Sequence, residues 1–212
     1  MNATKLLTAL FEADLKAQQV EAALLAEDPA SISKAIQQAA NDALRSTDEQ
    51  NATAQLVRLA DLCAQLQGAA MADTLVRILN HDAPEVRVAA GEALRDFAYD
   101  RYAEVARAIE RALEAEVKGP ALSEVPWILA EIAEPSALPL IARCLQHSDA
   151  EVVASAIEAL AELGEPHAME VLKPLVNDAR VVELQEGDAG YSTTIGELAS
   201  EAIDELSAGA SE

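Results

Sequence analysis

Side chains suited to nucleophilic or metal chemistry are scarce in this sequence, which has two cysteines and three histidines among 212 residues. Cys63 and Cys144 lie on helical patterns, and neither has a Cys or His nearby at metal-ligand spacing. We therefore predict that both are buried free thiols that act as small hydrophobic residues. His81 and His147 hold equivalent places in two copies of a repeat, which indicates a role at helix ends rather than in chemistry.

Motifs of the common enzyme classes are missing as well. The sequence has no Gly-rich phosphate loop, no Gly-x-Ser-x-Gly turn and no Cys pair. Asp178, Glu183, Glu186 and Asp188 are oxygen donors, but their spacing is not that of an EF-hand loop. We predict no catalytic residue, no cofactor and no metal site. The segment 178–192 that holds these donors is predicted to be a β-hairpin or an extended loop. It would serve as a recognition loop, as an edge strand for a partner, or only as cover for the last repeat.

Charge and composition restrict the class of partner. The chain has 37 acidic and 15 basic residues, a formal charge of −22. Such a surface repels nucleic acid and anionic membranes and favours cationic partners. The alternative is that the acidity only keeps an alanine-rich protein in solution. Residues 1–10 lack the features of a signal peptide, and no stretch reaches the ~18 apolar residues of a membrane span. We expect a cytoplasmic protein that binds neither nucleic acid nor membrane.

Blocks of sequence recur at fixed distances along the chain. Residues 130–135 recur 31 residues later at 161–166, and residues 80–86 resemble residues 146–152, which lie 66 residues later. Recurrence at such distances is typical of stacked helical units. The apolar content is 51%, whereas aromatic residues make up only 3%. We therefore predict a core of Ala and Leu, which suits closely packed helices.

Apolar residues at helical spacing run along most of the chain. They predict a three-helix segment over residues 1–68, repeats over 69–207 with the insertion 178–192, and a frayed tail at 208–212. Each repeat is expected to hold a helix of about three turns, a short polar turn and a second amphipathic helix. The apolar residues that anchor the second helices are Leu94, Leu129, Leu160 and Ile203, with Cys63 in the same place one unit earlier.

Several residues mark where the predicted helices begin and end. Asp28 before Pro29 is predicted to be an N-cap, and Gly68 and Gly164 are predicted helix stops. In a capping box, a Ser, Thr or Asp side chain and a Glu or Gln three residues later satisfy each other's free backbone N–H groups. Three such boxes are predicted: Thr47 with Gln50, Asp82 with Glu85, and Ser148 with Glu151.

Residues 82–94 read Asp-Ala-Pro-Glu-Val-Arg-Val-Ala-Ala-Gly-Glu-Ala-Leu, and residues 150–164 repeat the pattern with Val153 in the place of the arginine. The pattern resembles the HEAT repeat, specifically the short HEAT-like repeats first associated with phycobilisome bilin lyases. The resemblance covers residues 71–206. It implies an all-α, right-handed α-solenoid of about four or five helix pairs, with residues 1–68 as an N-terminal helical cap. None of the three histidines is followed by Glu, so the His-Glu pairs of HEAT-like di-iron hydroxylases are missing. The negative charge argues against the basic groove of HEAT-like DNA glycosylases.

If the resemblance holds, the second helices line the concave face, and equivalent positions can be compared between repeats. Two columns then cross the stack, and their members are Glu92, Trp127, Glu158 and Glu201 in one and Asp96, Glu131, Glu162 and Glu205 in the other. Asp61 and Gln65 are possible first members. Adjacent helices lie ~8–10 Å apart, about one Debye length, so the fields of neighbouring carboxylates add along the groove. The alternative is that these are ordinary solvated helix faces and that Trp127 packs into the next repeat.

Pro126 makes the backbone beside Trp127 irregular. If the helix begins near Pro120, Pro126 lies in its interior and kinks it. If Ser123 is the N-cap, Pro126 falls in the first turn and costs little. An irregular backbone is a common setting for a contact site, although it can equally be a packing irregularity.

The sequence therefore predicts a non-catalytic protein-interaction module, a scaffold or adaptor. The expected partner is a protein with a basic surface or segment, bound through the acidic concave face. Two alternatives stay open. One is an inhibitor or immunity-type antagonist, or a nucleic-acid mimic, that occupies a basic active site. The other is an accessory subunit of a bilin lyase or another enzyme.

Overall fold

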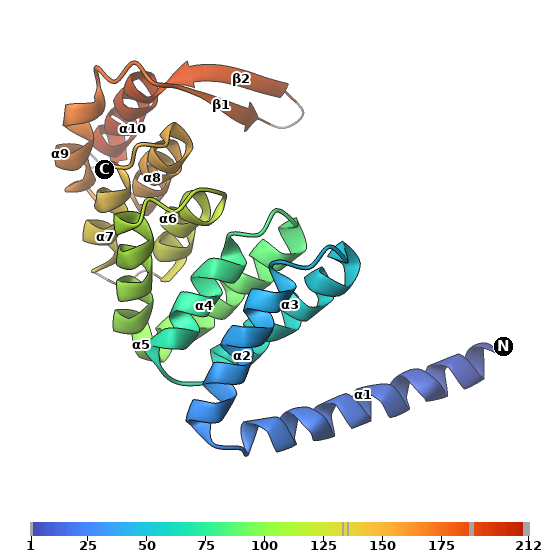
Figure 1. Ribbon diagram of the computed structural model, residues 1–212. Coiled ribbons are helices and arrows are strands. Elements are labelled where there is room, and N and C mark those ends of the chain that lie inside the picture. The colour runs from blue at the N-terminus through green and yellow to red at the C-terminus, as the bar shows by residue number, and fades with distance from the viewer. Residues whose placement is uncertain (1, 133, 135, 187–188, 210–212) are drawn as a thin grey trace.

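The computed structural model describes residues 2–132, 134, 136–186 and 189–209. The chain is mostly helical, with one hairpin inserted near the C-terminal end (Figure 1). The elements are α1 (Ala3–Leu25), α2 (Pro29–Ala43), α3 (Glu49–Gln65), α4 (Ala69–Leu79), α5 (Pro84–Glu114), α6 (Ala121–Ile132), α7 (Ala137–Cys144), α8 (Ala150–Leu163), α9 (Ala168–Leu172), the 3-10 turn η1 (Lys173–Leu175), β1 (Val181–Glu186), β2 (Ala189–Thr194) and α10 (Ile195–Gly209). The predicted all-α solenoid architecture is confirmed.

The helices stack as pairs. Within α5 the backbone leaves the helical region at Arg101 (φ −139°, ψ 38°), so α5 is two helices joined without a loop. The first half of α5 pairs with α4 and the second half leads into α6, which restores the alternation of first and second helices. The second helices form one continuous row, because α5 contacts both α3 and α6, α6 contacts α8, and α8 contacts α10. In Figure 1 the stack forms an arc, with α6 and α8 on its inner side and α7 and α9 on its outer side.

The core is built from Ala, Leu, Ile and Val, as the low aromatic content predicts. The predicted anchors Leu94, Leu129 and Leu160 are fully buried, and Ile203 is partly buried against the same cluster. Cys63 and Cys144 are buried free thiols, as predicted. Small alanines between the leucines let the helices approach closely, so one cluster runs continuously from α2 to α10.

The N-terminal helix α1 lies apart from the stack. None of its residues is buried, and only Leu24 and Leu25 in its last turn pack against the core. Glu21 of α1 pairs with Arg58 and accepts a hydrogen bond from Gln65 Nε2 (3.0 Å), both on α3. In Figure 1 the rest of α1 extends away from the body. The domain boundary predicted at residue 68 stays a prediction.

The observed helix caps differ from the predicted capping boxes. Asp28 caps α2 as predicted and accepts from the Ser31 N–H at 3.0 Å. The three predicted boxes are wrong, because each helix starts one residue later than the box requires. The observed N-caps are Asp48, Ala83 and Asp149 in place of Thr47, Asp82 and Ser148.

Histidine side chains order two of these helix starts. His81 Nδ1 accepts a hydrogen bond from the Ala83 N–H, and His147 Nδ1 accepts one from the Asp149 N–H, both at 3.1 Å. The equivalent histidines therefore have the structural role predicted for them. Gly164 closes α8 in the left-handed conformation (φ 64°), as predicted, because glycine adopts this conformation without a Cβ clash.

Arginines satisfy the free carbonyls at helix ends. The Arg101 guanidinium donates to the backbone carbonyls of Ala64 (3.0 Å), in the last turn of α3, and of Leu66, which follows α3 directly. It also lies 3.9 Å from the centre of the Phe97 ring. Because the last carbonyls of a helix have no partner within the helix, these bonds stabilise the turn between units. The kink in α5 places Arg101 where it can make them.

The inserted segment is a β-hairpin. Strands β1 and β2 pair antiparallel, with Val181 opposite Thr194 and Leu184 opposite Tyr191. Val182 is buried against the last units, and the hairpin otherwise projects from the stack (Figure 1). The turn residues predicted at 187 and 188 lie outside the described residues. A β-hairpin and an extended loop were the two forms predicted for residues 178–192, and the described residues of this segment form the hairpin.

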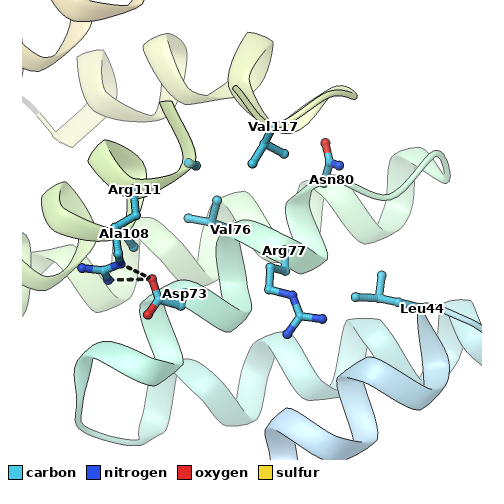
Figure 2. A pocket seen from close by; sticks show the side chains of 9 residues that line it. Leu44, Asp73, Val76, Arg77, Asn80, Ala108, Arg111 and Val117 are labelled. Atoms are coloured by element: carbon cyan, nitrogen blue, oxygen red, sulfur yellow. Dashed lines mark hydrogen bonds and ion pairs between the residues drawn. The ribbon is translucent and has the colours of Figure 1, made fainter. Parts of the chain in front are cut away.

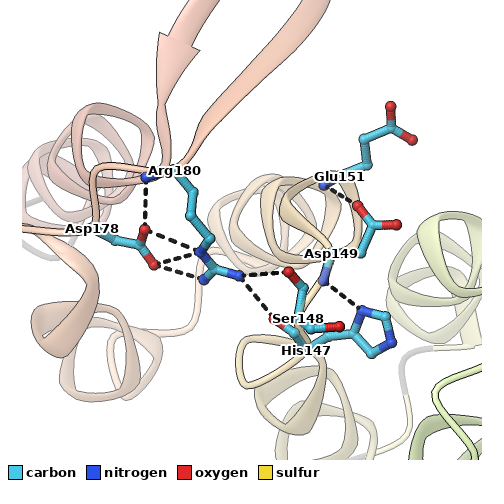
Figure 3. Close-up of polar contacts among 6 residues, drawn as sticks. All are labelled: His147, Ser148, Asp149, Glu151, Asp178 and Arg180. Atoms are coloured by element: carbon cyan, nitrogen blue, oxygen red, sulfur yellow. Dashed lines mark hydrogen bonds and ion pairs between the residues drawn. The ribbon is translucent and has the colours of Figure 1, made fainter.

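The base of the hairpin is held by an ion pair. The Arg180 guanidinium pairs with Asp178 through Nη2–Oδ2 at 2.6 Å and Nε–Oδ1 at 3.1 Å, and it also reaches the loop before α8 (Figure 3). These bonds hold the pKa of the Asp178 carboxyl below its usual value. Asp178, considered above as an oxygen donor, is therefore occupied by Arg180.

Candidate protein-binding surface

The eight predicted contact residues lie along the row of second helices. Glu92 and Asp96 come from α5, Trp127 and Glu131 from α6, and the others are Glu158, Glu162, Glu201 and Glu205 of α8 and α10. Glu158 is half-buried, Trp127 is 36% exposed, and the other six are exposed. Since these helices contact one another in order, the two sequence columns lie on neighbouring helices. Their role in binding stays a prediction.

Arginines partly neutralise the surface between α5 and α6. A hollow of about 240 Å³ here is lined by Glu92, Trp127 and Glu131, and also by Arg87 and Arg95. Arg95 forms an ion pair with Glu131. Arg87 Nε lies 2.9 Å from an oxygen of Glu124 on α6, as an ion pair with a hydrogen bond. The two columns predicted from the sequence did not include Arg87 and Arg95. The surface between α5 and α6 is therefore less acidic than the columns predicted.

The surface between α8 and α10 keeps its negative charge. A hollow of about 440 Å³ is lined by four glutamates and two aromatic residues together with small apolar residues, namely Trp127, Ile157, Glu158, Ala161, Glu162, Tyr191, Leu198, Glu201, Ala202 and Glu205. None of these lining residues is a Lys or Arg. We name this the α8–α10 hollow. Its four carboxylates share a concave surface, where an apolar floor strengthens their field.

Glu158 is the carboxylate most affected by this environment. Burial raises its pKa above the ordinary glutamate value, because the charged form is less well solvated there than in water. The charge of Glu158 therefore destabilises the folded protein, and a cation seated in the hollow would relieve that cost.

Trp127 stands between the two halves of the surface, since it lines both hollows. Its helix begins at Ala121, so Pro126 is an interior position, as in the first of the two predicted alternatives. Proline has no N–H, so the carbonyl of Leu122 loses its usual helical partner. Pro126 is itself buried, and it fixes the backbone beside the exposed indole.

Tyr191 belongs to the α8–α10 hollow although the columns do not contain it. It lies on β2, opposite Leu184 of β1, and is 46% exposed. A helix-by-helix comparison cannot find a residue that comes from an insertion. The signal available in the sequence was an aromatic residue in an acidic, turn-rich segment of a chain with very few aromatics.

The possible first members of the columns have other partners. Gln65 donates to Glu21 of α1, and Asp61 lies 3.9 Å from Arg58, which also pairs with Glu21. At this end of the stack the columns therefore meet the last turn of α1.

A further hollow of about 500 Å³ lies on the row of first helices, between α4 and the second half of α5 (Figure 2). Apolar residues, including Val76, Ala108 and Val117, line it. Arg111 closes one side through hydrogen bonds of 2.6 and 3.0 Å to Asp73. Asp73, the one carboxylate of this hollow, is paired with Arg111, and Arg77 bonds to the neutral Asn41, so the hollow offers no acidic field to a cationic ligand.

Other chemistry finds little support in the described residues. Among them, no group of three His, Cys, Asp or Glu side chains could hold a metal ion. Burial raises the pKa of both Cys63 and Cys144 to about 12, so these thiols are poor nucleophiles. Over the part of the chain that the structure covers, no helix has the length and apolar character needed to cross a membrane.

Comparison with known proteins identifies the repeat. Residues 123–186, from the first turn of α6 to the end of β1, match the family model of HEAT repeats. The chain therefore contains HEAT repeats over this segment. Proteins of this kind generally act as protein-interaction scaffolds, and the Val153-containing repeat, which departs from the usual arginine, lies inside the matched segment.

Three solved structures similar to this chain are crystal structures of engineered proteins from the Northeast Structural Genomics Consortium. The first has 20% identity and a TM-score of 0.35, covering 86% of this chain and 85% of the engineered one. The second has 19% identity and a TM-score of 0.35, covering 84% and 51%. The third has 19% identity and a TM-score of 0.34, covering 98% and 100%. None of the curated proteins matches the chain.

Proposed function

We propose that this HEAT-repeat protein is a non-catalytic scaffold or adaptor that binds a basic protein segment in the α8–α10 hollow. The observation that carries the proposal is the composition of that hollow, in which four glutamates and two aromatic residues line one concavity with no Lys or Arg among them. A cation bound there would have carboxylates from α8 and α10 and two aromatic side chains within the same hollow, a composition suited to ion pairing and cation–π contact.

The spacing of the glutamates favours an extended segment. Glu158 and Glu162 lie one turn apart on α8, as do Glu201 and Glu205 on α10, which is a rise of ~6 Å. Side chains on one face of an extended strand recur every second residue, about 6.6 Å apart. A strand with Lys or Arg at alternate positions, laid along the groove, would present its cations in step with these carboxylates.

The aromatic residues supply the apolar part of the contact. Trp127 and Tyr191 bring large side chains with few rotatable bonds, and such residues dominate interface energies when a partner removes them from water. The surface between α5 and α6 would contribute less, because Arg95 and Arg87 already neutralise Glu131 and Glu124.

The test is binding of a fluorescent peptide of alternating Lys and Ala, measured by anisotropy at low and high salt. The variant Glu158→Lys/Glu162→Lys is expected to lose at least tenfold in affinity, since one unit charge at 4 Å is worth ~1 kcal/mol even in water. Glu12→Lys/Glu116→Lys is the matched control. It makes the same change in net charge at two exposed sites outside the hollow.

Two outcomes would refute the proposal. One is an equal loss of affinity in the α8 variant and in the matched control, which would show that only the total charge matters. The other is binding of the alternating peptide that does not respond to salt. A peptide of the same composition with its lysines in one block should bind more weakly, because its cations do not match the glutamate spacing.

A further inference from the structure

Helix α1 exposes an apolar surface that its own chain does not cover. Six large apolar side chains on it are between 48% and 65% exposed, namely Leu6, Leu7, Leu10, Phe11, Leu15 and Val20. No residue of α1 is buried, and α1 contacts the stack mainly through α2 and through the bonds of Glu21. The stack therefore does not account for the apolar residues of the first five turns.

The helix is also poorly supported as an isolated element. Its first turn has no acidic residue and its last turn has no basic residue, so side chains do not compensate its macrodipole. Helices in proteins are stabilised mainly by packing of an apolar face, which α1 lacks over most of its length. Packing against another surface would supply that stabilisation.

The sequence of α1 contains a seam suited to another helix. Apolar residues alternate at spacings of three and four through the whole helix, at Ala3, Leu6, Leu10, Ala13, Ala17, Val20 and Leu24. This is the pattern of a coiled-coil seam over three heptads. Large and small residues are mixed along it, so a partner helix can approach closely where the alanines lie. Of the six exposed side chains, Phe11 and Leu15 lie outside this seam and Leu7 lies at its edge.

We propose that α1 pairs antiparallel with α1 of a second copy of this chain. The charge distribution selects this arrangement. The whole chain has a formal charge of −22, but α1 holds only three acidic and two basic residues, so the arm itself is nearly neutral. A 23-residue helix is ~35 Å long. Antiparallel pairing places the acidic bodies at opposite ends of the pair, several Debye lengths apart, whereas parallel pairing would bring them together.

The residues of the seam select one register. With Leu10 opposite Ala13 of the second copy, Leu6 falls opposite Ala17 and Ala3 opposite Val20. Each layer then joins one large and one small side chain, so the helices stay evenly spaced. Leu24 and Leu25 are left to their own core, where they already pack.

The register shifted by one heptad toward the C-terminal end of α1, with Leu10 opposite Val20, is excluded by charge. A shift of one heptad would place Lys16 beside Lys16 of the second copy and Asp14 beside its own equivalent. Like charges held this close oppose association. In the proposed register Lys16 instead faces Ala9, and Asp14 faces Leu7.

The first test is the mass of the full-length protein in solution, measured by light scattering across a range of concentrations. The wild type is expected to be a dimer, and Leu6→Asp/Leu10→Asp a monomer. Thr8→Asp/Gln19→Asp is the control, because it adds the same charge on the opposite face of α1 and should remain a dimer. Since α1 contributes no buried residue, all three should share one thermal unfolding transition of the body.

The second test distinguishes the orientation by disulfide trapping. Leu6→Cys protein mixed with Ala17→Cys protein should form a cross-linked heterodimer on oxidation, while Leu6→Cys alone should not. The native thiols of Cys63 and Cys144 are buried and do not compete. A monomeric wild type at all concentrations would overturn the proposal, as would a dimer that survives Leu6→Asp/Leu10→Asp. Self-linking of Leu6→Cys would overturn the antiparallel arrangement.

Discussion

The guanidinium of Arg180 donates a hydrogen bond of 2.9 Å to the backbone carbonyl of His147, on the loop that leads into α8. The same nitrogen reaches the carbonyl of Ser148 at 3.4 Å (Figure 3). Arg180 comes from the next unit, at the base of the hairpin. The Arg180 side chain therefore links the base of the hairpin to the preceding repeat, through the two backbone carbonyls that follow α7.

The two equivalent backbone carbonyls before α5, two repeats earlier in the chain, accept hydrogen bonds from a different arginine. There Arg87 Nη1 donates to the carbonyls of His81 (3.3 Å) and Asp82 (2.7 Å), from within the same repeat. In the later repeat Val153 stands where the pattern has arginine, and it is fully buried. Arg180 supplies the missing donor from another position in the sequence. The hydrogen bonds that Val153 cannot donate are thus made by Arg180 of the inserted segment.

Replacing Arg180 by alanine is expected to destabilise the C-terminal units. It removes the donor from two carbonyls and leaves Asp178 without its partner, and hydrogen bonds to charged groups contribute ~1.5–3 kcal/mol each when well formed. Because Arg180 is partly exposed, we expect a loss of about 1–2 kcal/mol. Thermal unfolding should shift down by several degrees, and backbone amides near the hairpin base should exchange faster.

The matched control is Lys173→Ala. It breaks an exposed pair with Glu170 in the same unit, and pairs of this kind contribute ~0–1 kcal/mol. Equal effects of the two substitutions would contradict the special role assigned to Arg180.

Replacing Glu158 by glutamine is expected to stabilise the protein at neutral pH while weakening binding of the basic peptide. Burial raises the pKa of Glu158 in the folded state, so the folded protein holds this proton more tightly than the unfolded chain. The destabilisation by the ionised form is therefore absent well below the ordinary value of 4.5 and fully present above the raised pKa. The variant should melt at a higher temperature than the wild type at pH 7, and the difference should shrink as the pH falls through the raised pKa toward 4.5 and vanish below it.

Glu162→Gln serves as the comparison for this prediction, because Glu162 lines the same hollow but is exposed. It should weaken peptide binding with a smaller change in melting temperature at pH 7. A gain for Glu158→Gln that persisted unchanged at low pH would show that the effect is not electrostatic.

Replacing Arg95 by glutamine is expected to strengthen binding of the basic peptide. Arg95 pairs with Glu131 across the surface between α5 and α6, so its removal frees a carboxylate beside Trp127. The gain should be no more than about fivefold, because a single charge at 4 Å is worth ~1 kcal/mol in water. Isothermal titration of wild type and variant at low salt would measure it.

Arg111→Gln tests whether that gain is local. It also removes one positive charge and frees a carboxylate, but Arg111 pairs with Asp73 on the row of first helices. If Arg95→Gln and Arg111→Gln raise the affinity equally, total charge rather than the surface of second helices governs binding.

Part of the candidate surface could be predicted from residues of one helix at a time. The positions of Glu158, Glu162, Glu201 and Glu205 follow from helical spacing, because residues one turn apart share a face. The pairing of Arg95 with Glu131 could not be found in this way, since it joins residues 36 positions apart on different helices. Tyr191 was missed for a similar reason, because the hairpin that carries it has no counterpart in the other repeats.

The sequence by itself determined the helices, their stacking as repeats and the apolar identity of the core, because these depend on local periodicity and on the recurrence of one unit. The sequence misplaced three helix starts by one residue. The N-cap is the residue whose backbone is not yet helical, and its position also depends on which neighbouring side chain accepts from the free N–H groups. Only the tertiary structure decided where the charge remains unpaired. Arginines from α5 neutralise the surface toward α6, whereas none lines the α8–α10 hollow. Net charge is a sum over the sequence, but an electrostatic field depends on which opposite charges the fold brings within a few ångströms of one another.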